Sequence, residues 1–445
     1  MGRAARGPPR DTGDPAMGWV RRLSARLDEP PEVVGGKAYG LVVLHRLGLP
    51  VPAGVVVTAE ACRAFLRDGR LPDGLRDELV TAVAGLSVVS VRSGAAVSMP
   101  GMMDTILNVR PTPDALEDAL KSVFSSWDTP RARTYRMLHG IPHDLGTAVV
   151  VQQMVFGDRD DRSGTGVAFS RDPNTGANVP FGEVLFGQQG DAVVSGRSLT
   201  LPLRELEREP EVWQGLRDAL NRIERHYRDA CYVEFTFESG VLWLLQVRPG
   251  RFTGAAAVRL ATDLADEGVI DRREALLRVS PQHLRHVRTP RIAPGVDVVA
   301  RGLGVCPGVA TGRVALTADE AVRMAAAGPV VLVRPETSPD DIRGLAAATG
   351  IVTARGGPAS HAAVVARSMG KPGVVGVGDR SLSAGTLVTI DGTSGEVVLG
   401  KPEVVTAAAD THLRRLLEWA DDVAGERGER DEVERLAAAH AVLRR

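Results

Sequence analysis

Hydrophobic positions near the start of the chain follow two different spacings. Residues 55–58 and 88–92 are short, largely apolar runs, which is the pattern of buried strands. Residues 59–67 and 75–84 carry apolar positions three and four apart, which is the pattern of helices. Because glycine and proline mark most junctions, the pattern predicts alternating strands and helices, a fold of class α/β (α+β).

The middle of the chain continues this alternation. The expected elements are a helical stretch at 111–138, a buried strand at 147–156, a turn-rich stretch with short strands at 157–196, a helix at 212–227, and strands at 232–238 and 241–247. Turn-rich short strands are typical of hairpins that fold over a ligand. Ser239 and Gly240 are expected to form the turn between the last two strands.

A second α/β unit is expected after the linker RTPRIAPG, whose two prolines stiffen it, and we place the boundary near Arg291. Its expected elements are a strand at 330–333, a helix at 339–348, a strand at 351–353, a helix at 361–369, and strands near 374 and at 387–391. From residue 406 the chain is helical, charged and partly Ala-rich, which is typical of an appended helix.

Composition narrows the function. The 445 residues suffice for about three folding units, and 54 Lys+Arg against 55 Asp+Glu disfavour nucleic acid and membrane surfaces as partners. Three cysteines without Cys-x-x-Cys spacing fit no disulfide framework or thiolate metal site. No apolar run approaches ~18 residues, so a cytoplasmic location is expected. Residues 1–16 are expected to be a disordered tail.

The sharpest chemical signal surrounds His361. Ser360 stands where a helix N-cap is expected, and His361 begins that helix. There the positive end of the helix dipole would lower the pKa of the imidazole and keep it neutral and nucleophilic. Gly356 and Gly357 would let a phosphate or another chain approach the backbone. A solvent-facing histidine at a helix start is the alternative.

Two further groups of residues suggest phosphate and metal chemistry. Lys37 follows two glycines and Arg92 ends a strand, so both can reach phosphate oxygens. Glu234, Gln246 and Arg248 can share one face of the expected hairpin, where Glu234 and Gln246 offer oxygen ligands to Mg²⁺. Taken singly, these residues also fit solvated turns and ordinary strand positions.

Several segments together resemble the pyruvate, phosphate dikinase family, in matching order. They are GGKAYGLVVLHRLGLPVPAG, SVRSGAAVSMPGMMDTILN, SGTGVAFSRDPNTG, EFTFESGVLWLLQVRPG, VLVRPETSPDDI and RGGPASHAAVVAR. The resemblance implies an ATP-grasp domain, with subdomains at 17–110 and 111–290 including linker helices. A swivelling β/β/α phosphohistidine domain at 291–403 and a helical segment at 404–445 would follow.

The resemblance also implies roles for single residues. His361 would accept the β-phosphoryl group of ATP, with Gly356, Gly357 and Ser360 supporting its loop. Mg²⁺ would be held by Glu234 and Gln246. The residues expected to contact the nucleotide or its phosphates are Lys37, Arg92, Gly101, Met103, Asp104, Glu183 and Arg248. The SMPGMMD loop is similar to that of the phosphate-dependent enzyme, so inorganic phosphate is the expected acceptor of the γ-phosphoryl group.

The chain departs from the family pattern at four places. Only about 40 residues follow residue 405, too few for the family's pyruvate-binding barrel of ~250 residues. Tyr232 stands where a carboxylate usually precedes the metal-binding glutamate, which puts metal affinity in doubt. A helical insertion between the Asn108 and Val123 regions is missing. Ala359 replaces the usual threonine, which excludes regulation by phosphorylation at that position.

These observations predict ATP- and phosphate-dependent autophosphorylation of His361, the nucleotide half-reaction of a pyruvate, phosphate dikinase. A separate barrel protein that binds phosphoenolpyruvate and pyruvate would be the partner, and a homodimer is left open. The alternative is a nucleotide-sensing pseudoenzyme that binds ATP without phosphotransfer.

Overall fold

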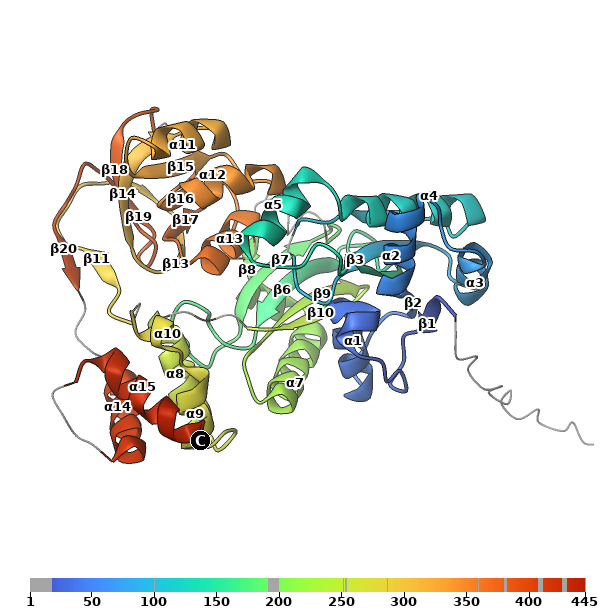
Figure 1. Cartoon of the computed structure of the whole chain (residues 1–445), viewed down its shortest axis with the longest axis horizontal. Helices are drawn as coiled ribbons and strands as arrows, with labels where there is room; N and C mark the ends of the chain where they lie inside the picture. The colour runs from blue at the N-terminus through green and yellow to red at the C-terminus, as the bar shows by residue number, and fades with distance from the viewer. Residues whose placement is uncertain are drawn as a thin grey trace, which may run out of the picture.

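The computed structural model describes residues 18–99, 101–190, 200–250, 252, 254–285, 287–358, 360–379, 382–406, 411–425 and 430–444. The expected tail at 1–16 and Ala359 lie outside this set. Figure 1 shows two sheets with their helices on one side of the molecule, a third sheet beside them, and a cluster of helices below the third sheet. The strands and helices alternate as a mixed α/β fold, which confirms the expected fold class.

The first sheet has the order β1-β2-β5-β3-β4. Its strands are β1 (Val20–Arg22), β2 (Gly54–Val57), β3 (Val89–Gly94), β4 (Thr105–Val109) and β5 (Ala148–Gln153). The helices of this part are α1 (Pro31–Arg46), α2 (Ala59–Asp68), α3 (Leu75–Ala82), α4 (Pro113–Ser126) and α5 (Pro130–Leu138). The single helical stretch expected at 111–138 is therefore two helices, because Pro130 lacks the N–H that would continue the first.

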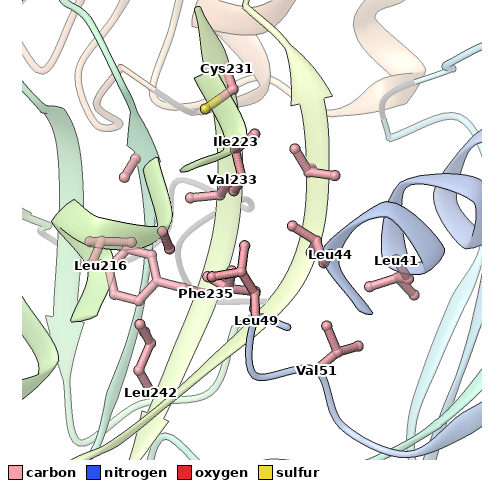
Figure 2. Packing of buried hydrophobic residues seen from close by; sticks show 14 of the residues in the cluster. Leu41, Leu44, Leu49, Val51, Leu216, Ile223, Cys231, Val233, Phe235 and Leu242 are labelled. Atoms are coloured by element: carbon pink, nitrogen blue, oxygen red, sulfur yellow. The ribbon is translucent and has the colours of Figure 1, made fainter. Parts of the chain in front are cut away.

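The second sheet has the order β10-β9-β6-β7-β8. Its strands are β6 (Gly164–Phe169), β7 (Phe181–Phe186), β8 (Leu201–Pro202), β9 (Cys231–Glu238) and β10 (Val241–Pro249), with η1 (Leu203–Arg208) and α7 (Pro210–Tyr227) packed on it. The odd-numbered residues of β9, such as Val233 and Phe235, point into the core with Leu44 and Leu216 (Figure 2). The even-numbered residues of β9 therefore lie on the opposite face.

The third sheet has eight strands in the order β12-β19-β18-β14-β15-β16-β17-β13. They are β12 (Val298–Arg301), β13 (Leu303–Cys306), β14 (Val309–Ala315), β15 (Val330–Arg334), β16 (Gly350–Thr353), β17 (Gly373–Val375), β18 (Leu387–Asp391) and β19 (Glu396–Leu399). Helices α11 (Ala318–Ala325), α12 (Ile342–Ala347) and α13 (His361–Met369) pack against it. The helix expected at 339–348 is a 3₁₀ turn, η2 (Pro339–Asp341), followed by α12.

The C-terminal helices form a unit with the linker helices. Helices α8 (Gly254–Asp266), α9 (Arg272–Arg278) and α10 (Pro281–Arg285) share one hydrophobic core with α14 (Thr411–Ala424) and α15 (Glu432–Leu443). The stretch after residue 406 is thus two helices. Their apolar faces are buried against α8–α10, so they are part of a packed unit and not the appended helix that the sequence predicts.

Two short strands connect this helical unit to the third sheet. Strand β11 (Pro290–Ile292) pairs with β20 (Val404–Thr406), so the two linkers run antiparallel side by side (Figure 1). The buried carboxylate of Asp391 accepts from the Arg291 Nε and the Ile292 amide, which ties β11 to the third sheet. None of the helices in the described ranges is long and apolar enough to cross a membrane.

Candidate functional site

Lys37 is held at the end of β3 by two glycines. Gly35 interrupts α1 with φ 78°, in the left-handed region where a side chain is strained. A Cβ on Gly35 would overlap the carbonyl oxygen of Gly94, the last residue of β3. Because these backbones meet without side chains, Lys37 comes to lie beside the strand that carries Arg92. Lys37 lies inside α1 rather than ahead of a helix.

Arg92 lies in the interior of the first sheet with its guanidinium directed across β5. One of its terminal nitrogens donates to the side-chain oxygen of Gln152 and, at 3.2 Å, to the carbonyl of Leu245 at the second sheet. Its buried Nε has no hydrogen-bond partner within the described residues. A buried N–H without a partner is able to donate to an anion.

Glu234, Gln246 and Arg248 do share one face of the second sheet, and a β-bulge is the reason. The turn at Ser239 and Gly240 would place Leu245 opposite Glu234 if the pairing ran regularly. An irregularity after Leu244 shifts the register by one, so Gln246 pairs with Glu234 and Arg248 with Tyr232. A one-residue shift moves side chains to the other face, and here it gathers these polar groups.

The same face continues across β6 and β7. Val167 pairs with both Glu234 and Glu183, so Glu183, Glu234 and Gln246 form one row. The Arg248 guanidinium donates to Glu234 at 3.2 Å and lies against the Gln246 amide. Tyr232 belongs to the neighbouring row, two residues away.

Lys37 and Arg92, from the first sheet side, face Glu234 and Arg248, from the second. Burial and the charge of Arg92 lower the pKa of the Lys37 ammonium to about 7; Glu234 opposes this shift and Arg248 adds to it. Three basic side chains thus converge with one carboxylate. Such a cluster attracts a polyanion, because the cations repel one another until negative charge is placed among them.

The loop at Gly101–Asp104 lies against the phosphohistidine candidate. Gly101 has φ 72°, and a Cβ there would approach the His361 ring to 3.3 Å. Met103 lies near the hydroxyl of Ser126, whose oxygen accepts from the Asp104 amide.

Arg131 fixes this loop and was not indicated by the sequence. Its guanidinium donates to the Met102 carbonyl and, at 2.6 Å, to the Asp104 carboxylate. It also lies 3.9 Å from Asp340 in η2, so it reaches from the first unit to the third. An arginine in α5, far along the chain from the loop, carries no local motif that would have revealed it.

His361 begins α13, as expected, with Ser360 as its N-cap: the Ser360 hydroxyl accepts from the Ala363 amide. The ring is 9% exposed, so the solvent-facing alternative is wrong. Its Nδ1 lies 3.0 Å from the Thr337 hydroxyl, while the buried Nε2 has no hydrogen-bond partner among the residues described. The nitrogen beside Gly101 is therefore the open one.

Burial lowers the pKa of His361 to about 4, and the nearby charge of Asp341 opposes the shift. The direction agrees with the sequence-based expectation, but the cause is desolvation of the ring, which the helix position alone does not determine. The imidazole is neutral and nucleophilic near pH 7.

The glycines before His361 serve two contacts. Gly356, with φ 104°, lets the Ser360 side chain approach; a Cβ there would come within 2.9 Å of it. A Cβ on Gly357 would overlap the carboxylate of Glu183. The second sheet and the His361 loop therefore meet at Glu183 and Gly357, and the structure brings Glu183 to the third unit as well as to the Glu234 row.

Two family models match the chain. The model for "Pyruvate phosphate dikinase, AMP/ATP-binding domain" matches residues 31–85 and 68–200, and "PEP-utilising enzyme, mobile domain" matches residues 326–395. The pyruvate, phosphate dikinases of Rhizobium meliloti (strain 1021) and Clostridium symbiosum are 35% and 33% identical over 88% and 91% of this chain. The chain belongs to the pyruvate, phosphate dikinase family. It has the ATP-grasp domain of that family followed by the mobile phosphohistidine domain.

The chain spans 58% and 60% of the length of these two pyruvate, phosphate dikinases. It spans 53% of the chloroplastic pyruvate, phosphate dikinase 1 of Arabidopsis thaliana, to which it is 34% identical. Among solved structures, D-cycloserine synthetase DcsG matches 53% of this chain and 70% of its own, at 14% identity and a TM-score of 0.30. The nucleotide-binding domain of the pyruvate, phosphate dikinase family implies that the chain binds ATP.

Proposed function

We propose that this chain catalyses ATP- and phosphate-dependent phosphorylation of its own His361, the nucleotide half-reaction of a pyruvate, phosphate dikinase. The observation that carries the proposal is the His361 ring, neutral by burial, with an open Nε2 beside the Gly101 loop. Lys37, Arg92 and Arg248 converge where the first two sheets meet. The structure therefore holds a candidate nucleophile and a candidate polyanion site while the third unit is in contact with the second sheet.

In this proposal the basic cluster holds the nucleotide. Lys37, Arg92 and Arg248 bind the triphosphate, and the open Nε of Arg92 supplies a donor to it. Gly101, Met103 and Asp104 cover the phosphates, with Arg131 holding the loop in place. Glu183 stands in the same row as Glu234 and lies against Gly357 of the His361 loop. Phosphoryl transfer depends on such positioning and charge neutralisation more than on covalent help from the protein.

Glu234 and Gln246 fit a magnesium ion in their donor chemistry, since they present a carboxylate and an amide oxygen on one face. In the described part of the chain, no group of three or more His, Cys, Asp or Glu side chains is placed so that it could hold a metal ion. Such a pair matches the way Mg²⁺ binds beside nucleotides, with few protein ligands and the rest from phosphates and water. When bound, the ion would neutralise charge on the triphosphate.

The proposed reaction consists of two phosphoryl transfers. Nε2 of His361 attacks the β-phosphorus, the bond to the α-phosphate oxygen breaks, and AMP leaves. The γ-phosphoryl group passes to inorganic phosphate, which gives diphosphate and leaves one phosphoryl group on His361. The Thr337 hydroxyl accepts a hydrogen bond from the Nδ1–H in this arrangement and orients the ring.

The acceptor after His361 is proposed from the relatives, whose names state pyruvate. A separate barrel protein that binds pyruvate would receive the group and form phosphoenolpyruvate. Such a transfer requires His361 to leave the nucleotide site. The paired linkers β11 and β20 support this movement, because a two-stranded connection allows the third unit to move as one body.

One observation favours the alternative, a nucleotide sensor without phosphotransfer. Tyr232 sits next to Glu234 in place of a second carboxylate, so fewer oxygen ligands surround the proposed ion.

The deciding experiment is incubation of the protein with ATP labelled at the β-phosphorus, Mg²⁺ and phosphate. Acid-labile label that is absent in His361→Asn, with AMP and diphosphate formed in equal amounts, supports phosphotransfer. ATP binding without label under any divalent metal favours the sensor instead.

A further inference from the structure

An aromatic pair lies in the row next to Glu234. By the register of the second sheet, Phe181, Phe169, Tyr232 and Arg248 stand side by side across β7, β6, β9 and β10. The rings of Phe169 and Tyr232 meet edge to face, with centroids 5.0 Å apart. They are 5% and 8% exposed although they are on the sheet's site face, so another part of the chain covers them.

That cover includes Arg367 of α13. Its guanidinium lies 5.7 Å from the centre of the Phe169 ring. Inside its own unit it donates to the carbonyls of Val305 and Pro358. Because Pro358 stands three residues before His361, the guanidinium connects the Phe169 ring to the loop that carries the histidine.

The other end of the pair touches the basic cluster. The Arg248 guanidinium lies 5.6 Å from the centre of the Tyr232 ring. A cation above an aromatic ring is attracted by the ring's quadrupole, and the ring does not neutralise it as a carboxylate would. Arg248, which also donates to Glu234, thus rests on a residue that contacts Phe169.

We propose that Phe169 and Tyr232 are the seat on which the phosphohistidine unit docks, and that Tyr232 is a positioning residue linking Arg248 to the placement of His361. The contacts run from Arg248 to Tyr232, Phe169 and Arg367, and from Arg367 to the His361 loop. A phosphate that orders Arg248 would hold Tyr232 in place and favour the docked unit. The role in phosphotransfer rests on the function proposed above, whereas docking itself does not.

Docking is measured on the full chain by hydrogen exchange of residues 361–369, with and without ATP and Mg²⁺. In Phe169→Leu and Tyr232→Leu, the exchange rate of this helix is expected to rise about tenfold. Each substitution removes the free energy of an aromatic pair or of a cation–π contact from the docked state. The slowing of exchange by ATP is expected to be lost in Tyr232→Leu and retained in Tyr232→Phe. Phe181→Leu, in the same row, controls for lost apolar area and should match wild type.

Single-turnover labelling at saturating ATP gives the second readout. Phosphohistidine formation should slow about tenfold in both leucine variants, with Tyr232→Phe restoring it, while the Kd of ATP for Phe169→Leu stays within about twofold of wild type. The seat is overturned if both leucine variants keep wild-type exchange, or if Phe181→Leu behaves as they do. If wild type forms no phosphohistidine but the leucine variants alter exchange, the seat stands and the proposed function fails.

Discussion

The hydroxyl oxygen of Thr337 lies 3.0 Å from Nδ1 of His361, and this contact decides which ring nitrogen is open. For Nε2 to act as a nucleophile, Nδ1 must carry the proton and donate it to that hydroxyl. Thr337 is buried and belongs to the loop before η2, so the donor and acceptor are held together by packing of the third unit.

Thr337→Val keeps the shape of the side chain and removes the hydroxyl. We expect phosphohistidine formation to slow about fivefold, since a net hydrogen bond contributes about 1 kcal/mol and the N–H at Nδ1 loses its acceptor. Initial rates with β-labelled ATP measure the effect. Thr337→Ser, which keeps a hydroxyl, should recover most of the rate; a valine variant as fast as wild type would contradict the role.

The pH dependence of His361 follows from its burial. Because burial lowers the pKa to about 4, the ring stays neutral as pH falls from 8 to about 5, where an ordinary histidine would be mostly protonated. The unfolded chain takes up this proton first, so the free energy of unfolding should decrease as pH drops from about 6.5 towards 4. Titration of the His361 ring resonance by NMR, assigned with His361→Asn, checks the value. A midpoint near 6.5 in the docked protein would refute the burial argument.

Lys37 should take up a proton when nucleotide binds. With a pKa of about 7 in the free protein, the amine is largely neutral at pH 8, and a triphosphate beside it raises the pKa by attraction of the charged form. Calorimetric titration with ATP at pH 8 in buffers of different ionisation enthalpy measures the uptake. Lys37→Met supplies the control, because the proton uptake that belongs to the nucleotide itself remains in that variant. Equal uptake in both proteins would show that Lys37 is already charged.

Gly357→Ala is expected to push the His361 loop away from the second sheet, because the new Cβ overlaps the Glu183 carboxylate. Overpacking of this kind costs about 1–3 kcal/mol, and about 1.4 kcal/mol corresponds to a factor of ten. Phosphohistidine formation should therefore fall about fivefold or more, while ATP binding is unchanged. Labelling and equilibrium binding separate the two effects.

Gly215→Ala is the matched control for that substitution. Gly215 lies in α7, where a Cβ would meet Leu242 at an ordinary 3.5 Å. Its helix should gain about 0.5–1 kcal/mol of stability, and phosphohistidine formation should not change. A Gly357→Ala protein that phosphorylates His361 as fast as this control would exclude a contact at Glu183 during the reaction.

Arg171 joins the nucleotide-binding domain to the helical unit. Its fully buried guanidinium donates to Glu224 of α7 and to Glu267, which follows α8. Arg171→Met leaves two carboxylates without their cation and should destabilise the chain by about 3–5 kcal/mol, measured by urea denaturation. Arg159→Met, at an exposed ion pair with Glu238, should cost less than about 1 kcal/mol. Similar losses in both variants would mean that Arg171 is not a buried anchor.

Local sequence determined much of this protein, because the controlling forces act between near neighbours. Apolar spacing predicted β5, β9, β10 and α13, and Ser360 marked the start of α13 through the N-cap hydrogen bond. The hairpin turn at Ser239 and Gly240 was also predictable, since both residues adopt positive φ. Pro130 is a further local signal, because proline favours the first turn of a helix, and α5 begins there.

Tertiary structure decided the contacts between residues that lie far apart in the chain. The bulge after Leu244 brings Gln246 opposite Glu234, whereas regular pairing from the turn would put these side chains on opposite faces. The pKa of His361 follows from burial by its own unit and by Gly101, more than 200 positions away. The apolar faces of α14 and α15 are likewise buried against α8–α10, which stand more than 100 residues earlier in the chain. Burial and register depend on which surfaces meet, so the sequence supplied the groups and only the folded chain set their environment.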